Sequence, residues 1–325
     1  MNPRPAIAIP VRGVVVSVIA SILFGAVALL GARLDGFTSE EVTAWRVVFI
    51  VLALAAVHIP RSQRREFVAD AKRIVTSATR ILVLLVCTTI MWFQLWVFMW
   101  GSANGRSQDV AMGYFLLPLV MVLVGRVLFR DAMSPWQRAA VIAAAVGVLA
   151  QLVSTRSVGW PVLLIAGLYP VYFALRRWFD MDTKHVFLME ALLLLIPAAF
   201  FIGTGAFVTG TAPASTPTLL VVVGLSGIAM TLYIMASTWL PLGLFGLLSY
   251  LEPVLLLAAA VALGYALGLT DIFVYGPILV ALVFLIVGGA RAKRGEPVTI
   301  SGQAVLTTTG TVPIVLPTAA ELNAK

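Results

Sequence analysis

A carboxylate stands inside one of the most apolar stretches of the chain. Glu252 precedes Pro253 in SYLEPVLLL (249–257), and apolar residues continue on both sides from about Leu242 to Leu267. A run of this length is typical of a helix that spans a bilayer. An ionised group at that depth costs at least about 2.5–3.5 kcal/mol, so it should face the protein interior and have a partner. Glu252 is therefore the first candidate for a functional site.

Arg46 is the second ionisable group inside an apolar segment, about one turn into its predicted helix. Counted from opposite membrane faces at about 1.5 Å per residue, Arg46 and Glu252 lie roughly 7 Å apart in depth, which an arginine side chain covers. One interpretation is a fixed ion pair that joins two helices. The other is a shared role in handling substrate or protons. Both stay open, and both residues are substrate-binding candidates.

Three prolines inside apolar segments are expected to break their helices: Pro118, Pro170 and Pro253. Proline has no backbone N–H, so the carbonyl four residues earlier loses its helical partner. The carbonyls concerned belong to Tyr114, Ala166 and Ser249. At membrane depth, a freed carbonyl needs a substrate, a water or a side chain. Tyr114 and Ser249 therefore join the substrate-binding candidates.

Aromatic and amide side chains complete the candidate site. Tyr169 shares a helix face with Tyr172 and Arg176 and lies deep enough to line a cavity, whereas Arg176 and Arg177 are expected to anchor the helix at the inner interface. Tyr250 lies two residues before Glu252. Gln94 projects away from an aromatic stripe formed by Trp92, Trp96 and Trp100, and a buried amide needs hydrogen-bond partners. Tyr169, Tyr250 and Gln94 are the remaining candidates.

The composition defines the elements that position these residues. The chain has 325 residues, of which 61% are hydrophobic and 11% charged, with a mean hydropathy of +1.04. This is too apolar for a soluble fold, and the long continuous runs predict helices instead of a β-barrel. We expect an all-α membrane protein with ten transmembrane helices, at about 12–32, 41–60, 78–100, 109–129, 135–153, 158–177, 185–204, 217–239, 242–266 and 271–290.

The basic residues predict the orientation of these helices. If the N-terminus is cytoplasmic, 18 of the 22 Lys and Arg residues lie nearer the cytoplasmic ends of the helices, as the positive-inside rule requires. The four that lie nearer the outer ends are Arg33, Arg46, Arg106 and Arg156. The termini, residues 1–11 and a disordered tail over 291–325, are then cytoplasmic. The basic stretch 61–73 is expected to be a topology-setting loop whose first part lies on lipid headgroups, so the net charge of +8 indicates membrane lipids and no nucleic acid.

An internal repeat relates two parts of the chain. An offset of 135 residues superposes GYFLLPLVMVLVGRVLF (113–129) on LSYLEPVLLLAAAVALG (248–264), with Pro118 on Pro253. The two segments are five spans apart, and an odd number reverses the direction in which the second half enters the membrane. We therefore expect two inverted five-helix repeats, 12–153 and 154–290, with a substrate site near the midplane.

Several motifs resemble a known family: SILFG (21–25), AWR (44–46), GYFLLPLVMVLVGRVLF (113–129), GLYPVYFALRRW (167–178) and LFGLLSYLEPVLLL (244–257). They are similar to RarD-type permeases, in the EamA part of the drug/metabolite transporter superfamily. The resemblance implies inverted five-helix halves, cytoplasmic termini, a bacterial inner-membrane location and export of metabolites or drugs. The chain departs from the pattern at Arg130-Asp131, where relatives often carry Gly-Glu, and at Tyr265, where the family position is acidic.

These features favour a secondary transporter that moves small organic molecules by alternating access, most simply outward, with protons as a second candidate partner. The chain is not expected to be an enzyme. His58 and His185 lack the spacing of membrane hydrolases, no Gly-Lys-Ser/Thr loop indicates ATP coupling, and the single cysteine, Cys87, excludes a Cys-based metal site. We expect no cofactor and no metal. A polytopic enzyme acting on a lipid and a non-transporting scaffold or sensor remain the alternatives.

Overall fold

Helices make up all the regular secondary structure in the part of the chain that the structure describes. The computed structural model describes residues 11–31, 34, 36–104, 106–131, 133–155, 159–211, 213–252, 254–255 and 268–293. Pro253 and the expected tail beyond residue 293 lie outside the described residues. The prediction of an all-helical chain is confirmed within these ranges.

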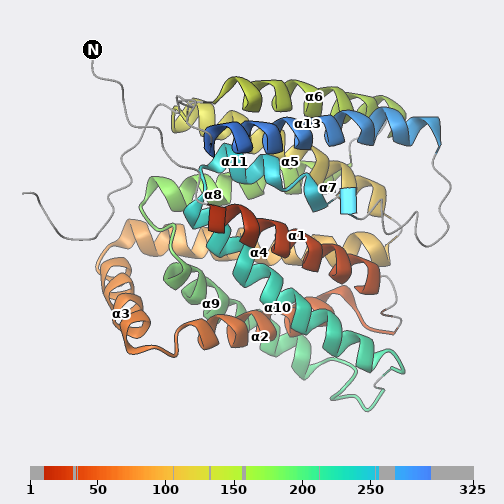
Figure 1. Cartoon of the computed structure of the whole chain (residues 1–325). Coiled ribbons are helices and arrows are strands. Elements are labelled where there is room, and N and C mark those ends of the chain that lie inside the picture. Colours follow the sequence, from red (N-terminus) through yellow and green to blue (C-terminus); the bar gives the residue numbers. More distant parts are fainter. Residues whose placement is uncertain are drawn as a thin grey trace, which may run out of the picture.

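The described helices follow the apolar segments of the sequence (Figure 1). They are α1 (Val11–Gly31), α2 (Ser39–Val57), α3 (Arg61–Val75), α4 (Ala78–Ala103), α5 (Ser107–Leu128), α6 (Pro135–Thr155), α7 (Trp160–Leu163), the π-helix η1 (Leu164–Leu168), α8 (Tyr169–Trp178), α9 (Lys184–Gly203), α10 (Thr216–Trp239), α11 (Leu242–Leu248) and α13 (Leu269–Lys293).

Length and composition make six of these helices candidate membrane spans, namely α1, α4, α5, α6, α9 and α10. Helices α2 and α3 would add a seventh if the bent pair, which meets at 117°, is counted as one span. The described residues thus give a multi-pass membrane protein, and the full count of ten spans remains a prediction.

Hydroxyl side chains start several of the helices. The Thr38 hydroxyl accepts a hydrogen bond from the Glu41 backbone N–H at 3.2 Å, and Thr183 does the same for Val186 at 3.2 Å. Each hydroxyl satisfies one of the backbone N–H groups that the first turn of a helix leaves without a partner. Such caps set the start of α2 and of α9, and therefore the depth at which their side chains lie.

Two helices that border the candidate site are irregular. Before Pro170 the backbone widens into the π-helix η1, a common response where an i−4 hydrogen bond is missing. The helix α11 ends at Leu248, and Ser249 and Tyr250 form a turn before helical backbone returns at Leu251. The predicted continuous span from 242 is therefore interrupted at Ser249 and Tyr250, just before Glu252.

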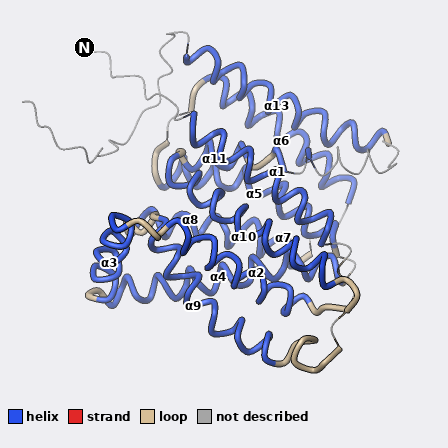
Figure 2. Tube along the Cα trace, turned by 60° about the horizontal axis from the view of Figure 1, so that its bottom comes forward, coloured by secondary structure: helices blue, strands red, loops and turns tan. Residues whose placement is uncertain are grey.

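The helices pack as a bundle in which segments far apart in sequence lie side by side (Figures 1 and 2). The helix pairs with the most extensive contacts are α6 with α13, α1 with α10, α2 with α10, α2 with α9, and α5 with α11. The pair α6 and α13 covers one side of the bundle and shares a small core with α5 and α11, to which it contributes Ala140, Ala144 and Ile278. A larger core joins α1, α2, α4, α8, α9 and α10.

One end of the bundle collects the basic residues of the chain, and we refer to it as the basic end. Here α2, α5 and α8 end, α4, α6 and α9 begin, and α3 lies across the bundle (Figure 1). The prediction of a loop over 61–73 is wrong, because these residues form α3. Helix α3 buries Ile74 and leaves Arg61, Arg64 and Arg65 exposed, so the segment is an amphipathic helix lying on the end of the bundle.

A central cavity as the candidate functional site

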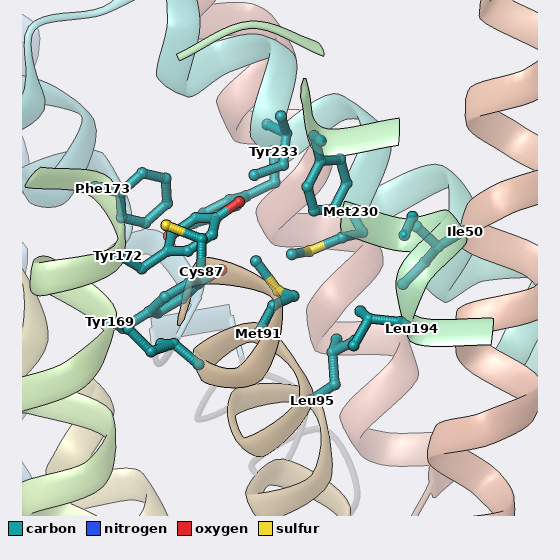
Figure 3. Close-up of a cluster of buried hydrophobic side chains, with 14 of the residues drawn as sticks. Ile50, Cys87, Met91, Leu95, Tyr169, Tyr172, Phe173, Leu194, Met230 and Tyr233 are labelled. Carbon is teal, nitrogen blue, oxygen red and sulfur yellow. The ribbon is translucent and has the colours of Figure 1, made fainter. Parts of the chain in front are cut away.

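A cavity of about 580 Å³, part of it open to the outside, lies at the centre of the bundle. Seven helices contribute to it, from both parts of the chain. Its lining consists of Phe24, Arg46, Met91, Gln94, Leu95, Phe98, Tyr114, Leu117, Tyr169, Met230, Tyr233, Ser249 and Glu252. Figure 3 shows Met91, Leu95, Tyr169, Met230 and Tyr233 within a cluster of buried side chains.

Six of the seven substrate-binding candidates line this cavity: Arg46, Gln94, Tyr114, Tyr169, Ser249 and Glu252. They come from α2, α4, α5, α8 and the segment that follows α11. Tyr250 is the exception among the candidates. It is fully buried, and its hydroxyl donates to the Phe115 carbonyl oxygen at 3.0 Å, which joins the turn after α11 to α5.

The Glu252 carboxylate lines the cavity without a protein partner. Its side chain is partly buried, and no hydrogen bond or ion pair to it is found among the described residues. Only its backbone N–H is engaged, donating to the Ser249 carbonyl at 3.2 Å. A carboxylate at this depth needs a counter-charge, a proton or hydrogen-bond donors. The group is therefore available to a molecule that enters the cavity.

Arg46 has its partners on other helices. It is 2% exposed, its Nε donates to the Ser226 hydroxyl at 2.8 Å, and its Nη1 donates to the Leu95 carbonyl at 3.0 Å. The Phe98 ring lies 5.5 Å from its guanidinium carbon. The fixed ion pair between Arg46 and Glu252 is absent among the described contacts, so Arg46 joins α2 to α10 and α4 in this conformation.

Gln94 is the second polar group of the cavity that lacks a protein partner. The side chain is 3% exposed, and neither amide atom has a hydrogen bond within the described residues. An unpaired buried amide costs about 1–3 kcal/mol relative to a paired one. A ligand with both a donor and an acceptor would pair both atoms of this amide.

The prolines act differently from the expectation of three freed carbonyls. Pro118 lies inside the continuous helix α5, whereas Pro170 follows the π-helix η1. The Ser249 carbonyl is not free, because it accepts the Glu252 N–H one residue short of the α-helical partner. The expected break at Pro253 falls on a residue outside the described ranges. The polar character of the site thus comes mainly from side chains.

A buried ion pair at the basic end escaped prediction. Arg176 is fully buried instead of anchoring its helix at the interface, and its Nη1 lies 2.9 Å from the Glu190 carboxylate. The Tyr172 hydroxyl donates to the same carboxylate oxygen at 2.8 Å, and the Arg176 Nη2 donates to the Thr183 carbonyl at 2.7 Å. The sequence signal for this ion pair was Glu190, a carboxylate inside the apolar run 184–203.

Arg177 is also engaged by protein. Its guanidinium makes two hydrogen bonds of 2.9 Å to Asp131 and lies over the Phe129 ring, 4.3 Å from its centroid. The acidic residue that replaces the family's Gly-Glu pattern therefore joins the end of α5 to α8. At the basic end, Asp131 thus serves as a contact between two helices.

The tryptophan stripe of α4 packs against other helices, as expected. Trp92 stacks on Phe201, Trp96 stacks on Trp160, and the Trp96 indole N–H donates to Glu40 at 2.8 Å. These contacts join α4 to α9, α7 and α2. The stripe therefore has a packing role at the end of the bundle opposite α3.

Comparisons with known proteins agree with this fold and site. The EamA-like transporter family matches residues 11–153. The chain is 33% identical over 289 residues to the chloramphenicol-sensitive protein RarD of Pseudomonas aeruginosa, covering 88% of this chain and 97% of that relative. It is 30% identical over 288 residues to an uncharacterized transporter of Pasteurella multocida, covering 87% and 99%.

A solved crystal structure shares the fold. It superposes with a TM-score of 0.55 at 19% sequence identity, covering 86% of this chain and 96% of the other. Together with these named relatives, the bundle of apolar spans makes this chain a multi-pass membrane transporter of the bacterial inner membrane. The chain belongs to the EamA-like transporter family and, within it, to the RarD-type permeases.

Proposed function

We propose that this transporter carries small, amphipathic organic molecules across the inner membrane by alternating access and binds them in the central cavity. The observation that supports this most directly is the pair of unpartnered polar groups, the Glu252 carboxylate and the Gln94 amide. Both stand in an apolar surrounding, where an unpaired polar group is costly. The polar groups of a ligand would supply the missing partners.

The lining favours a ligand with an aromatic or apolar body and a polar or cationic group. Phe24, Phe98 and Tyr169 present ring surfaces to the cavity, and aromatic rings attract both apolar groups and cations. Glu252 would bind an ammonium group or a proton. Gln94 would pair with an amide, a hydroxyl or a carbonyl of the ligand.

A change in the partners of Arg46 would couple ligand binding to the opening and closing of the cavity. Here its guanidinium is held by Ser226 and Leu95, and Glu252 is unpaired. In a second conformation Arg46 would turn to Glu252 and displace the proton or cation bound there. Ligand occupancy would then depend on which side of the cavity is open, as alternating access requires.

Ten spans in two inverted repeats, 12–153 and 154–290, are part of this proposal. Three of the five helix pairs that the repeat makes equivalent pack against one another: α2 with α9, α5 with α11, and α6 with α13. An axis in the membrane plane that passes between the members of each pair would produce this pattern. The family match to residues 11–153 covers the same range as the first half.

The proposed orientation places the basic end and both termini in the cytoplasm, with transport directed outward. The charge distribution supports this orientation. In a Cys87→Ala background, a cysteine at Arg64 should be protected from an impermeant thiol reagent in intact cells, and one at Thr211 should react. Labelling of position 64 from outside would reverse the orientation.

Transport into proteoliposomes tests the function directly. Chloramphenicol is a suitable first probe, because the Pseudomonas relative is named for sensitivity to it. Radiolabelled aromatic amines and neutral aromatic amides follow as a panel. We expect uptake to require the wild-type cavity and to be lost in Glu252→Gln, whereas Glu40→Gln, which removes a carboxylate bonded to Trp96 outside the cavity, should retain it. Equal uptake by both variants would contradict the role of the cavity.

A further inference from the structure

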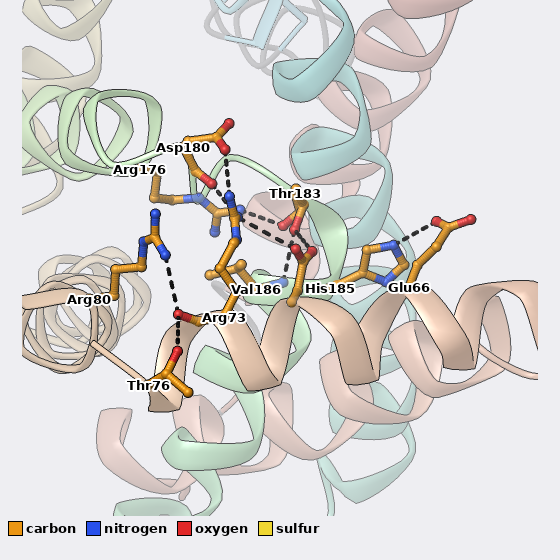
Figure 4. Close-up of polar contacts among 10 residues, drawn as sticks. Glu66, Arg73, Thr76, Arg80, Arg176, Asp180, Thr183, His185 and Val186 are labelled. Atoms are coloured by element: carbon orange, nitrogen blue, oxygen red, sulfur yellow. Dashed lines mark hydrogen bonds and ion pairs between the residues drawn. The ribbon is translucent and has the colours of Figure 1, made fainter. Parts of the chain in front are cut away.

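Both histidines of the chain meet at the basic end. His58 follows the last residue of α2, and His185 lies in the first turn of α9, 127 residues later. The His58 Nε2 lies 2.9 Å from the His185 Nδ1. On the far side, the His185 Nε2 lies 3.0 Å from a Glu66 carboxylate oxygen of α3, as Figure 4 shows. The His58 Nδ1 lies 2.7 Å from the Leu54 carbonyl.

These three contacts need more hydrogens than neutral side chains supply. The Leu54 carbonyl is only an acceptor, so the His58 Nδ1 must carry a hydrogen. The His58 Nε2 then accepts from the His185 Nδ1–H. The contact between the His185 Nε2 and Glu66 requires a third hydrogen, but two neutral imidazoles and a carboxylate hold only two. All three contacts can therefore be hydrogen bonds only when the three side chains together bind one additional proton.

The additional proton is expected on His185. An imidazole keeps its proton to a higher pH than a carboxylate does, so Glu66 serves as the acceptor. Burial lowers the pKa of His58, and the neighbouring charges of His185 and Lys184 lower it further, against the Leu54 and Glu66 contacts, which raise it. His58 thus stays neutral, as its acceptor role requires. His58 and His185 are 6% and 5% exposed, while the Glu66 side chain is 57% exposed and in reach of solvent protons.

The surroundings leave Glu66 and Lys184 as the charges that act on the pair. Three other charged groups at this end are engaged elsewhere: Asp70 accepts from Thr183, Arg73 binds Asp180, and Arg80 donates to the Arg73 carbonyl. Arg61, Arg64 and Arg65, on the same helix as Glu66, are exposed to solvent. The sequence of α2 after Arg46 and the whole of α10 carry no charged residue. One proton therefore decides whether this set of contacts is complete.

We propose that His58, His185 and Glu66 form a proton-binding clasp that holds α2 and α3 of the first part of the chain against α9 of the second. With one proton bound, all three contacts are hydrogen bonds. When that proton leaves, two lone pairs face each other at one of the contacts, and the clasp opens. The clasp lies at the basic end, apart from the cavity, and its function does not depend on the identity of the substrate.

Ring ¹⁵N spectra of the full-length protein in lipid nanodiscs test the proton site, because the chain has only two histidines to label. At pH 6 we expect one ring with both nitrogens protonated and one neutral ring with hydrogen on Nδ1. His185→Gln assigns the signals, and the doubly protonated ring should be the one that disappears. Two neutral rings at pH 6, or the additional proton on His58, would overturn the site.

Two carboxylate variants on α3 test the role of Glu66. Glu66→Gln should weaken the signal of the doubly protonated ring at pH 6, because the amide carries no negative charge. Asp70→Asn removes the same charge one turn away, where the carboxylate binds Thr183 and no histidine, and should weaken that signal much less. Equal losses in the two variants would contradict a specific Glu66 contact.

A distance measurement tests whether the proton holds the helices together. Spin labels at Ser62 on α3 and at Trp178 at the end of α8, in a Cys87→Ala background, are both at exposed positions. Because the Arg176–Glu190 ion pair joins α8 to α9, the two labels report on the two sides of the clasp. The distance distribution should broaden as pH rises through the transition seen in the ¹⁵N spectra, and His185→Gln should remove that dependence. A distribution unchanged across the transition would overturn the clasp.

Discussion

The central cavity and the basic end both hold polar groups among apolar helices, but they treat them in opposite ways. In the cavity, Glu252 and both amide atoms of Gln94 lack protein partners within the described residues. At the basic end, Glu190 binds Arg176, and Asp131 binds Arg177. Polar groups with fixed partners hold helices together, whereas polar groups facing a cavity without partners are available for a ligand.

The comparison separates stability from function. Loss of a polar group at the basic end removes contacts that the fold already makes. Loss of a polar group in the cavity removes a contact that forms only when a ligand is bound. It also removes a buried polar group that the free protein leaves without a hydrogen-bond partner. The same type of substitution should therefore have opposite effects on the free energy of unfolding in the two regions.

The largest effect is expected at the buried ion pair. Arg176→Met leaves the Glu190 carboxylate buried without its counter-charge and should lower the free energy of unfolding by about 3–5 kcal/mol. Denaturant titration in detergent micelles measures the change. The double variant Arg176→Met/Glu190→Met should recover much of the loss. A double variant as unstable as the single one would show that packing, and not charge, dominates there.

The next effect concerns transport. Glu252→Gln should lower the transport rate at least tenfold, about 1.4 kcal/mol, because the amide neither titrates nor carries charge. Its free energy of unfolding should be no lower than that of the wild type, since the carboxylate has no partner to lose among the described residues. If the variant instead loses stability and Arg46→Met restores it, the two residues form a structural pair.

Gln94 and Gln137 offer a matched contrast between the two kinds of buried amide. Gln94→Leu should raise the free energy of unfolding by about 1 kcal/mol and weaken substrate binding, because it removes an amide without partners. Gln137 accepts the Ser134 backbone N–H at 2.8 Å, so Gln137→Leu should lower stability. Changes of the same sign in the two variants would contradict the distinction between cavity and framework.

The smallest effect is a pH dependence of stability at the basic end. The pKa of His58 is lowered from its ordinary value of 6.5, chiefly by burial, so the folded state favours the neutral ring. This contribution is fully present above pH 6.5 and is lost as pH falls through the lowered pKa. The proton that the clasp binds on His185 acts in the opposite direction, so the measurement uses His185→Gln as the background. Melting temperatures between pH 5 and 8 should decline toward low pH in this variant, and the double variant His58→Gln/His185→Gln should lack the decline.

The sequence by itself determined the helices, because hydropathy, proline position and capping hydroxyls act over a few neighbouring residues. It also indicated the site: Glu252, Arg46, Gln94, Tyr114, Tyr169 and Ser249 line one cavity because a polar group in an apolar segment must turn inward. The amphipathic helix α3 was missed because a run of charges was interpreted as a loop, although its Phe67 and Ile74 lie seven residues, or two helical turns, apart and so share one face.

Only the tertiary structure decided which polar groups are paired. Arg46 binds Ser226 instead of Glu252, Arg177 binds Asp131, and His58 meets His185, across separations of 180, 46 and 127 residues. Tyr250 turned away from the cavity to the Phe115 carbonyl for the same reason. A hydrogen bond depends on distance and angle within a few tenths of an ångström, and those are fixed by how distant helices pack, which no local pattern of residues records.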